Sequence, residues 1–197
     1  MEMRIWAAVR MTIVLTVLTG IVYPLAIAAA ARALFPWQAE GSLVTSGGTV
    51  VGSALIGQNF SAPRYFRGRP SAAGNNGYDA ANSGGSNLGP TNKSLLTAVA
   101  ARVHEVRESN PGTTTVPVDL VTASGSGLDP EISLAAADLQ IPRVAKARGL
   151  DEDTVRKLVR ANTERRFLGL FGEPGVNVLM LNLALDRLRP GDRPAGS

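Results

Sequence analysis

The sequence predicts an α+β protein in which one N-terminal transmembrane helix is followed by a single mixed α+β soluble domain. Residues 11–31 contain no charged side chain, and as a helix they would be about 31 Å long, which matches the ~30 Å hydrocarbon core of a bilayer. The rest of the chain mixes short apolar runs with segments of helical periodicity. The ~160 residues outside the span are enough for one hydrophobic core.

The apolar segment 11–31, with flanks from about 5 to 36, is predicted to stay in the membrane as a single span. Arg4 and Arg10 precede it, whereas only Arg32 lies within about twenty residues of its far end. Positive charge favours the cytoplasmic side, so residues 1–10 are predicted to be cytoplasmic and residues 38–189 to form an extracytoplasmic domain. A cleaved signal peptide is the alternative, because small residues at 26–28 and 31–33 resemble cleavage sites, although signal peptides have apolar cores of only ~7–15 residues.

One side of the predicted membrane helix carries small or notched residues at every fourth position. Such a surface lets a second helix approach closely in lipid, where apolar burial does not drive association. The same composition is ordinary in membrane helices, so both interpretations stay open. Proline lacks an N–H group, which predicts a bend at its position. The candidate helix-packing residues are Thr12, Thr16, Gly20, Pro24 and Ala28.

The first part of the soluble domain is predicted to contain short strands and then a long loop. Val50-Val51 and Ala54-Leu55-Ile56 are short apolar runs between glycines, which predicts one or two strands. Residues 61–92 are rich in Gly, Asn, Ser, Ala and Pro and predict a loop, and loops of this length are usually disordered or functional. One cluster in it predicts a partner surface or a domain-packing surface rather than a catalytic site. Its members are Arg64, Tyr65, Phe66, Arg67 and Arg69.

After the loop, a helix is predicted from a cap at Thr91 or Asn92 to about Ser109. Residues 116–122 (VPVDLVT) alternate between apolar and polar and predict a strand, which Pro117 restricts to a sheet edge. The apolar stripe of the helix consists of Leu95, Leu96, Val99, Val103 and Val106.

The C-terminal third predicts three more helices and a buried strand. A helix starts at Glu131 and ends at Pro142, where another begins and runs to Gly149. Asp151 caps a further helix, with Val155, Leu158 and Val159 on its inner face. Residues 176–188 predict a buried strand that gives way to a short helix, and residues 190–197 a flexible tail.

Composition excludes several classes of function. The chain has no cysteine and one histidine, which excludes disulfides and thiolate zinc sites and argues against any transition-metal site. The net charge of +4 is spread along the chain and aromatic residues make up 5%, so no nucleic-acid partner is predicted. His104 lies in mid-helix among charged residues, which is a poor position for a catalytic base. No catalytic residue and no metal ligand is predicted.

Two glycine- and serine-rich segments are candidates for binding a nucleotide or another anion. Backbone amides in such turns can point at an anion, but neither segment has the G-x-S-x-G spacing of a serine nucleophile. Residues 89–94 end in Lys-Ser, yet Asn92 stands where a phosphate-binding loop needs glycine. Turn formation is the alternative for both segments. The candidates are Ser83, Gly84, Gly85, Ser86, Asn87, Ser124, Gly125 and Ser126.

Seven short blocks follow the N-terminal span in order: FPWQA (35–39), GSALIGQNF (52–60), YFRGRPS (65–71), SGGSNL (83–88), VTASGSGLD (121–129), IPRVAKAR (141–148), and VNV leading to LNLALD (176–186). With Tyr23-Pro24 in the span, they resemble the C subunit of the Kdp-type potassium-transporting ATPase over nearly the whole chain. Two departures are minor: Leu134 stands where many members have proline, and Asp79 where many have asparagine.

The resemblance implies a non-catalytic accessory subunit of a high-affinity, ATP-driven potassium uptake complex in the bacterial inner membrane. The implied partners are a potassium-channel-like subunit and a P-type ATPase catalytic subunit, besides membrane lipid. The subunit would stabilise or assemble the complex and act as a chaperone that raises the ATP affinity of the pump subunit. No tightly bound cofactor is implied, and ATP enters at the level of the complex.

Two other functions stay open. A membrane-tethered envelope serine hydrolase would use Ser86 or Ser126, and a nucleotide-binding protein would use the Ser83 and Ser124 loops. A cytoplasmic N-terminus places both loops outside the membrane, where ATP is scarce. Direct nucleotide contact would therefore require the opposite topology.

Overall fold

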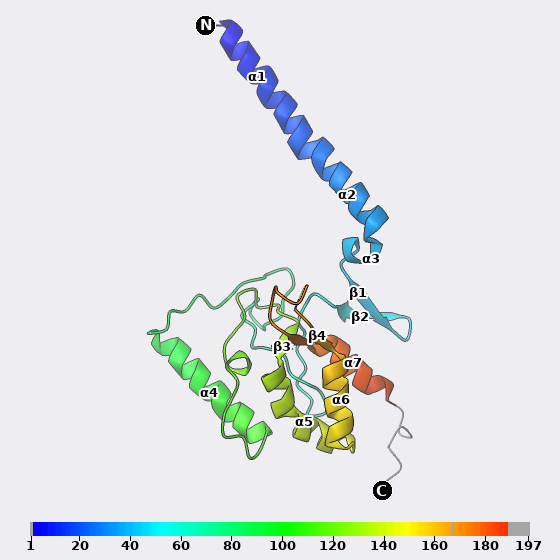
Figure 1. Ribbon diagram of the computed structural model, residues 1–197. Helices are drawn as coiled ribbons and strands as arrows, with labels where there is room; N and C mark the ends of the chain where they lie inside the picture. Colours follow the sequence, from blue (N-terminus) through cyan, green and yellow to red (C-terminus); the bar gives the residue numbers. More distant parts are fainter. Residues whose placement is uncertain (1, 167, 189–197) are drawn as a thin grey trace. The chain divides into compact units, whose positions relative to one another are not determined.

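The computed structural model describes residues 2–166 and 168–188, which form two compact units that divide between Ser53 and Ala54. Figure 1 shows a long helix and a small hairpin in the first unit, and the remaining helices and strands in the second. The sequence predicts a soluble domain from residue 38, whereas residues 38–53 group with the helix. Residues 189–197, where the tail is predicted, lie outside the described residues.

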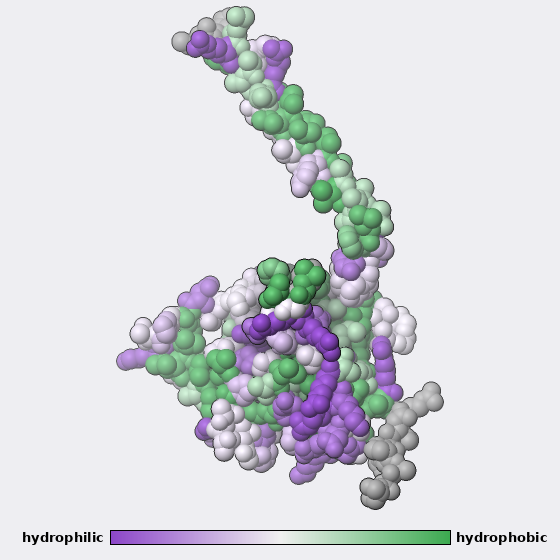
Figure 2. Space-filling view, in the orientation of Figure 1, coloured by the Kyte–Doolittle hydropathy of each residue, from purple (hydrophilic) through white to green (hydrophobic). Residues whose placement is uncertain are grey.

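The first unit is dominated by one apolar helix, built from α1 (Glu2–Val17), a π-helical turn η1 (Leu18–Val22) and α2 (Tyr23–Leu34). The stretch Met3–Leu34 is long and apolar enough to cross a membrane, and none of its most apolar window is buried. Figure 2 shows hydrophobic residues along most of its surface. The predicted N-terminal apolar helix is confirmed as a candidate membrane span.

The π turn lies directly before Pro24. The backbone N–H of Tyr23 donates to the carbonyl of Leu18, five residues back, instead of four. The Thr19 hydroxyl donates to the Leu15 carbonyl at 2.7 Å. Where the sequence predicts a bend, the structure thus has a local widening of the helix, in keeping with the N–H that proline lacks.

A short helix α3 (Pro36–Ala39) and an antiparallel hairpin complete the first unit. The hairpin consists of β1 (Leu43–Ser46) and β2 (Thr49–Ser53), joined by Gly47 and Gly48, which both have positive φ. Such two-residue turns need left-handed backbone conformations. The strand at Val50-Val51 is confirmed, the strand at 54–56 is wrong because those residues form a turn and a bend, and β1 was not predicted.

The second unit is a small α+β domain. Its sheet has the order β3 (Glu131–Ser133), β5 (Gly175–Asn177) and β4 (Thr163–Glu164), and both pairings are antiparallel. Helices α5 (Leu134–Arg148), α6 (Glu152–Ala161) and α7 (Val178–Arg187) supply most of the core. The buried core includes Phe66, Ile132, Ile141, Val144, Val155, Val159, Val176, Leu181 and Leu185.

Two predicted boundaries near β3 are wrong. Residues 131–133 form a strand, and the helix begins only after Ser133, whose hydroxyl accepts from the Ala136 N–H at 3.0 Å. Pro142 lies inside α5 and does not end it, because Ile141, Val144 and Ala145 around it are buried and hold the helix against the core. Gly149, with φ of +64°, terminates α5 as predicted.

The predicted strand at 116–122 is also wrong. The segment forms a 3-10 turn, η2 (Val118–Leu120), preceded by Pro117. The Asp119 carboxylate accepts from the backbone N–H of Ser133 at 2.7 Å and from its hydroxyl at 3.1 Å. The carboxylate therefore satisfies polar groups at the end of β3, and Pro117 has no N–H for a ladder.

The other predicted elements are confirmed. Asn92 caps α4 (Lys93–Ser109) by accepting from the Ser94 N–H at 2.8 Å, and Asp151 caps α6 by accepting from the Thr154 N–H at 2.7 Å. The strand-to-helix transition at 175–187 is present, and residues 54–92 contain neither helix nor strand. The apolar stripe predicted on α4 is only partly covered: Val106 packs half-buried against the core, whereas Leu96 is exposed, and α4 has no fully buried residue.

Candidate functional site

Buried amide side chains hold the segment 65–67 against two helices. Asn182, from α7, accepts from the Phe66 N–H and donates to the Phe66 carbonyl, both at 2.9 Å. Gln140, from α5, accepts from the Arg67 N–H at 2.8 Å and donates to the Arg67 carbonyl at 3.2 Å. Both amides are almost fully buried. The segment is therefore fixed by two reciprocal pairs of hydrogen bonds, which satisfy backbone groups that a core would otherwise leave unpaired.

The structure corrects the prediction that Phe66 belongs to a partner surface. Its side chain is fully buried in the core, so it is not available to a partner, and it matches the domain-packing alternative instead. Beside it, the Arg143 guanidinium donates to the carbonyls of Pro63 and Tyr65 at 2.5 and 3.0 Å and to Asn110 at 3.1 Å. Burial, and the charge of Arg67, lower the pKa of Arg143 to about 10.

Tyr65 lies in a cluster of charged side chains. Its hydroxyl donates to Asp186 at 3.0 Å, and the guanidinium groups of Arg148 and Arg64 lie 5.1 and 5.4 Å from the centre of its ring. Arg148 also donates to Asp186 at 2.8 Å and is mostly buried. The cluster joins the loop to the ends of α5 and α7, with cation–π contacts and ion pairs acting together.

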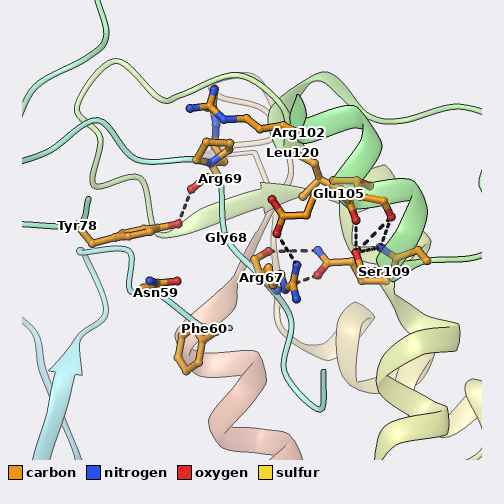
Figure 3. A pocket seen from close by; sticks show the side chains of 14 residues that line it. Asn59, Phe60, Arg67, Gly68, Arg69, Tyr78, Arg102, Glu105, Ser109 and Leu120 are labelled. Carbon is orange, nitrogen blue, oxygen red and sulfur yellow. Dashed lines mark hydrogen bonds and ion pairs between the residues drawn. The ribbon is translucent and has the colours of Figure 1, made fainter. Parts of the chain in front are cut away.

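A pocket of about 200 Å³ lies between the loop segment 59–70 and α4 (Figure 3). Three arginine side chains and one carboxylate line it, and because Asp129 also pairs with one of the arginines, the excess is one positive charge. Arg67 pairs with Glu105 at 3.1 Å, Arg69 pairs with Asp129 at 2.9 Å, and Arg102 donates to the Val121 carbonyl at 3.0 Å. The lining suits an anionic group such as a carboxylate or phosphate.

The two arginines predicted at this surface are partly engaged within the domain. The Nε atoms of Arg67 and Arg69 are buried and, within the described residues, lack a hydrogen-bond partner. Tyr78 closes one side of the pocket, where its hydroxyl donates to the Arg69 carbonyl. Burial, and the nearby Asp129 carboxylate, raise the pKa of Tyr78, so the phenol stays protonated as a donor.

The two predicted anion-binding segments lie next to each other. The Gly84 N–H and the Ser83 hydroxyl both donate to the Ser126 carbonyl, at 2.8 and 3.0 Å. The Ser126 hydroxyl accepts from the Leu128 N–H at 3.1 Å, and Ser124 is buried. Much of the polar capacity of these segments is thus used between them, whereas Ser86 and Asn87 are exposed.

Glycine is required where the segments touch. A Cβ on Gly85 would lie 2.9 Å from the Gly125 carbonyl oxygen, and one on Gly127, which has φ of +67°, would lie 2.6 Å from the Gly84 carbonyl oxygen. The Ser71 hydroxyl joins the same region by donating to the Gly127 carbonyl at 2.5 Å and accepting from the Tyr78 N–H at 2.6 Å. The glycines therefore permit close backbone packing between the two segments.

Catalytic geometry is not found among the described residues. His104 is exposed on α4, and its Nδ1 lies 3.4 Å from a carboxylate oxygen of Glu108 on the same helix. The same part of the chain contains no group of three His, Cys, Asp or Glu side chains suited to a metal ion.

Comparison with known proteins decides the family. The family model described as "KdpC: K+-transporting ATPase, c chain" matches residues 5–187. The chain belongs to the KdpC family. A potassium-transporting ATPase KdpC subunit of Sorangium cellulosum is 60% identical over 183 residues, which cover 92% of this chain and 96% of the relative. The KdpC subunits of Rhodopseudomonas palustris (57%; 91% and 94% covered) and Mycobacterium tuberculosis (55%; 95% and 100% covered) are similar over comparable lengths.

Reasoning from the sequence missed the residues that fasten the KdpC loop. Asn182 and Gln140 stand in helices at inward-facing positions, beside Leu181, Leu185 and Ile141. A polar residue on the apolar face of a helix is a signal for a buried hydrogen bond. The partner of that bond lies more than seventy residues away in each case, which no local pattern reveals.

Proposed function

We propose that this chain is a non-catalytic accessory subunit of a high-affinity, ATP-driven potassium uptake complex, which it stabilises or assembles from the membrane. The observation that carries the proposal is the match to the KdpC family over residues 5–187. The candidate span supports it, since a helix of 32 residues whose most apolar window is entirely unburied needs lipid or other helices around it. The proposed partners are a potassium-channel-like subunit and a P-type ATPase catalytic subunit.

The helix is proposed to pack against partner helices through its small residues. Residues four apart on an α-helix are rotated by about 40°, so a row at every fourth position drifts around the helix. The π turn accommodates about one extra residue, roughly 100° of rotation, which opposes the drift. Thr12, Thr16, Gly20, Pro24 and Ala28 therefore stay closer to one side than they would on an uninterrupted α-helix.

The soluble domain is proposed to lie outside the cytoplasm and to dock on the outer face of the channel-like subunit. The Lys/Arg count around the span supports this orientation. The loop that is fastened by Asn182 and Gln140 supports a binding role, because a surface held in one shape loses little entropy on docking. Bacterial inner-membrane localisation follows from the same proposal.

A chaperone-like effect on the ATP affinity of the pump subunit is proposed only at the level of the complex. The Ser83 and Ser124 segments use many of their polar groups on each other, and the proposed orientation keeps them away from cytoplasmic ATP. Labelling tests this: a cysteine introduced at position 86 in the full chain should react with a membrane-impermeant thiol reagent in intact cells. Reaction only after permeabilisation would contradict the orientation.

Co-purification tests the proposed function itself. The tagged full chain, expressed with the other subunits and extracted in mild detergent, should recover a channel-like and a P-type ATPase subunit identifiable by mass. Gly20→Leu should lower this recovery, whereas Val22→Leu, roughly on the opposite side of the same turn, should not. Recovery of neither subunit by the unchanged chain would refute the proposal, and equal effects of both variants would refute the small-residue face.

A further inference from the structure

The loop between Ser71 and Tyr78 contains an asparagine, Asn76, that is directly followed by a glycine, Gly77. Among the asparagines of the chain, Asn76 alone precedes a glycine. In such a pair the next backbone nitrogen can attack the side-chain amide, and glycine has no side chain to obstruct the attack. Asparagine is one of the thermolabile residues for this reason. The loop therefore contains a position where covalent change is chemically easy.

Hydrogen bonds close the base of this loop. The Ser71 hydroxyl accepts from the backbone N–H groups of Ala73 and Tyr78, at 3.1 and 2.6 Å. The Asp79 N–H donates to the Ala73 carbonyl at 3.1 Å, and Ala73 is fully buried. Residues 74–77 therefore form a short turn on a base that is fixed to the domain.

The turn itself leaves the Asn76 side chain unprotected. Asn75 and Asn76 are both exposed, and within the described part of the chain no hydrogen bond engages either side chain. Gly74 and Gly77, which flank them, have φ of +68° and +74°. A glycine on each side gives the turn the backbone freedom that ring closure between a side chain and the next nitrogen requires. The Asn76 amide is thus open both to water and to its neighbour.

Other asparagines of the chain are less open to the same attack. Asn82 donates from its side-chain nitrogen to the Asp79 carboxylate at 2.6 Å, and Asn92 uses its side-chain oxygen to cap α4. Asn110 precedes a proline, whose nitrogen carries no hydrogen. Asn87 is exposed but precedes a leucine, whose branched side chain crowds the attacking nitrogen. Sequence and structure therefore single out the asparagine of the Asn-Gly pair.

We propose that Asn76 is a site of spontaneous deamidation in the folded chain. The Gly77 nitrogen gives up its proton to the solvent and bonds to the carbonyl carbon of the Asn76 side chain, and the side-chain nitrogen takes up a proton and leaves as ammonia. Water then opens the cyclic imide at either of its carbonyls, which yields aspartate or isoaspartate. Water is the only co-reactant, and the inference does not depend on the proposed function.

Deamidation changes both the charge and the length of the loop. A neutral amide becomes a carboxylate, and isoaspartate also adds a methylene group to the main chain. Because the base is closed at Ser71, the added length must be taken up between Ala73 and Tyr78. Tyr78 lines the pocket beside α4 (Figure 3), so the change at position 76 would loosen the backbone that carries one wall of that pocket.

Peptide mapping of the aged protein tests the site. The full chain in detergent is kept in mildly alkaline buffer at a temperature at which it stays folded, and fragment ions then locate each converted asparagine. Asn76 should lose its amide before Asn82 and Asn87 do, and the loss should slow in mildly acidic buffer, because the attacking nitrogen must first lose a proton. Conversion at the same rate at all three positions, or an Asn76 amide that persists, would overturn the proposal.

Matched variants separate this reaction from general damage. Asn76→Gln keeps an amide but needs a larger ring for the same attack, so the early conversion should disappear. Asn75→Gln, one residue earlier in the same turn, is the control and should leave the conversion at Asn76 unchanged. Early conversion that survives in Asn76→Gln would refute the mechanism, and so would its loss in the control.

Hydrogen exchange tests the effect on the pocket wall. The Tyr78 amide, which donates to Ser71, should exchange faster in the aged chain than in the fresh chain. Asn76→Gln, aged in the same way, should show no such acceleration. Equal exchange in aged and fresh protein would contradict the inferred loosening, as would equal acceleration in the variant.

Discussion

The arginine-rich segment 64–69 and the apolar segment 168–171 differ in which side chains they expose to solvent. In the first, Phe66 is fully buried and Arg67 and Arg69 pair with acidic side chains of the same domain. In the second, Leu170 and Phe171 face outward with most of their surface uncovered. Polarity alone therefore does not tell which surface meets a partner. A polar loop whose backbone is bonded to buried amides is fixed to its domain, whereas the large apolar side chains of segment 168–171 are left exposed.

The two phenylalanines give the largest expected difference. Phe66→Ala should lower the free energy of unfolding by about 3–5 kcal/mol, because it leaves a cavity in the core. Phe171→Ala should change it by less than about 0.5 kcal/mol, as is usual for surface positions. Urea unfolding of the full chain in detergent, followed by circular dichroism, measures both. Similar losses for the two variants would break the contrast between the segments.

The next largest effect on stability is expected for Asn182, the buried amide of α7. Asn182→Leu should destabilise the chain by about 2–3 kcal/mol, because the Phe66 N–H and carbonyl would remain buried without partners. Met180→Leu, on an exposed part of the same helix, is the control and should have little effect. Hydrogen exchange at the Phe66 amide should accelerate in the first variant only; unchanged exchange there would show that the fastening is not the role of Asn182.

Two adjacent glycines, Gly84 and Gly85, test how tightly the two serine-rich segments pack against each other. Gly85→Ala should destabilise by about 1–3 kcal/mol, because its Cβ would lie 2.9 Å from the Gly125 carbonyl oxygen. Gly84→Ala, where a Cβ meets nothing within 4 Å, is the matched control and should stay within about 0.5 kcal/mol. Unfolding midpoints in urea decide between them, and equal midpoints would mean that the segments separate easily.

The smallest effect on stability is expected for Glu131 in β3, which pairs with the strand that follows the apolar segment. Burial, and then the carboxylates of Glu164 and Asp129, raise the pKa of Glu131. A folded-state pKa above the unfolded value means that stability is highest where Glu131 is protonated and falls as pH rises through the folded pKa. Glu131→Gln should therefore be up to about 0.5 kcal/mol more stable than the unchanged chain at pH 7, since solvent screens a partly exposed group, and the gain should vanish below about pH 4. A gain that persists in acid would have another cause.

Local signals in the sequence predict local features of this fold well. Asn92 and Asp151 each place a side-chain oxygen before a periodic run, and both cap the expected helix. Gly149 ends α5 in the left-handed conformation that favours glycine. The charge-free run 11–31 likewise predicts the long apolar helix.

Features that depend on distant residues were not predictable in this way. Pro142 is a helix breaker by its chemistry, yet the packing of Ile141 and Val144 keeps α5 continuous. The alternation at 116–122 suggests a strand, but the Asp119 carboxylate instead accepts a hydrogen bond from the backbone N–H of Ser133. The Ser83 and Ser124 segments were both identified as candidates, while their contact, across some forty residues, appears only in three dimensions.

The π turn before Pro24 leaves the apolar helix with an uneven hydrogen-bond count, since position 24 brings a carbonyl but no N–H. Hydrocarbon offers no donor to the surplus oxygen, and water does not reach the bilayer centre. A serine, threonine or asparagine on a neighbouring helix at that depth would meet this need. The middle of the helix therefore has one backbone carbonyl in need of a donor within an otherwise apolar surface. Its depth in the bilayer is where a hydrogen-bonding neighbour helix would contact this helix.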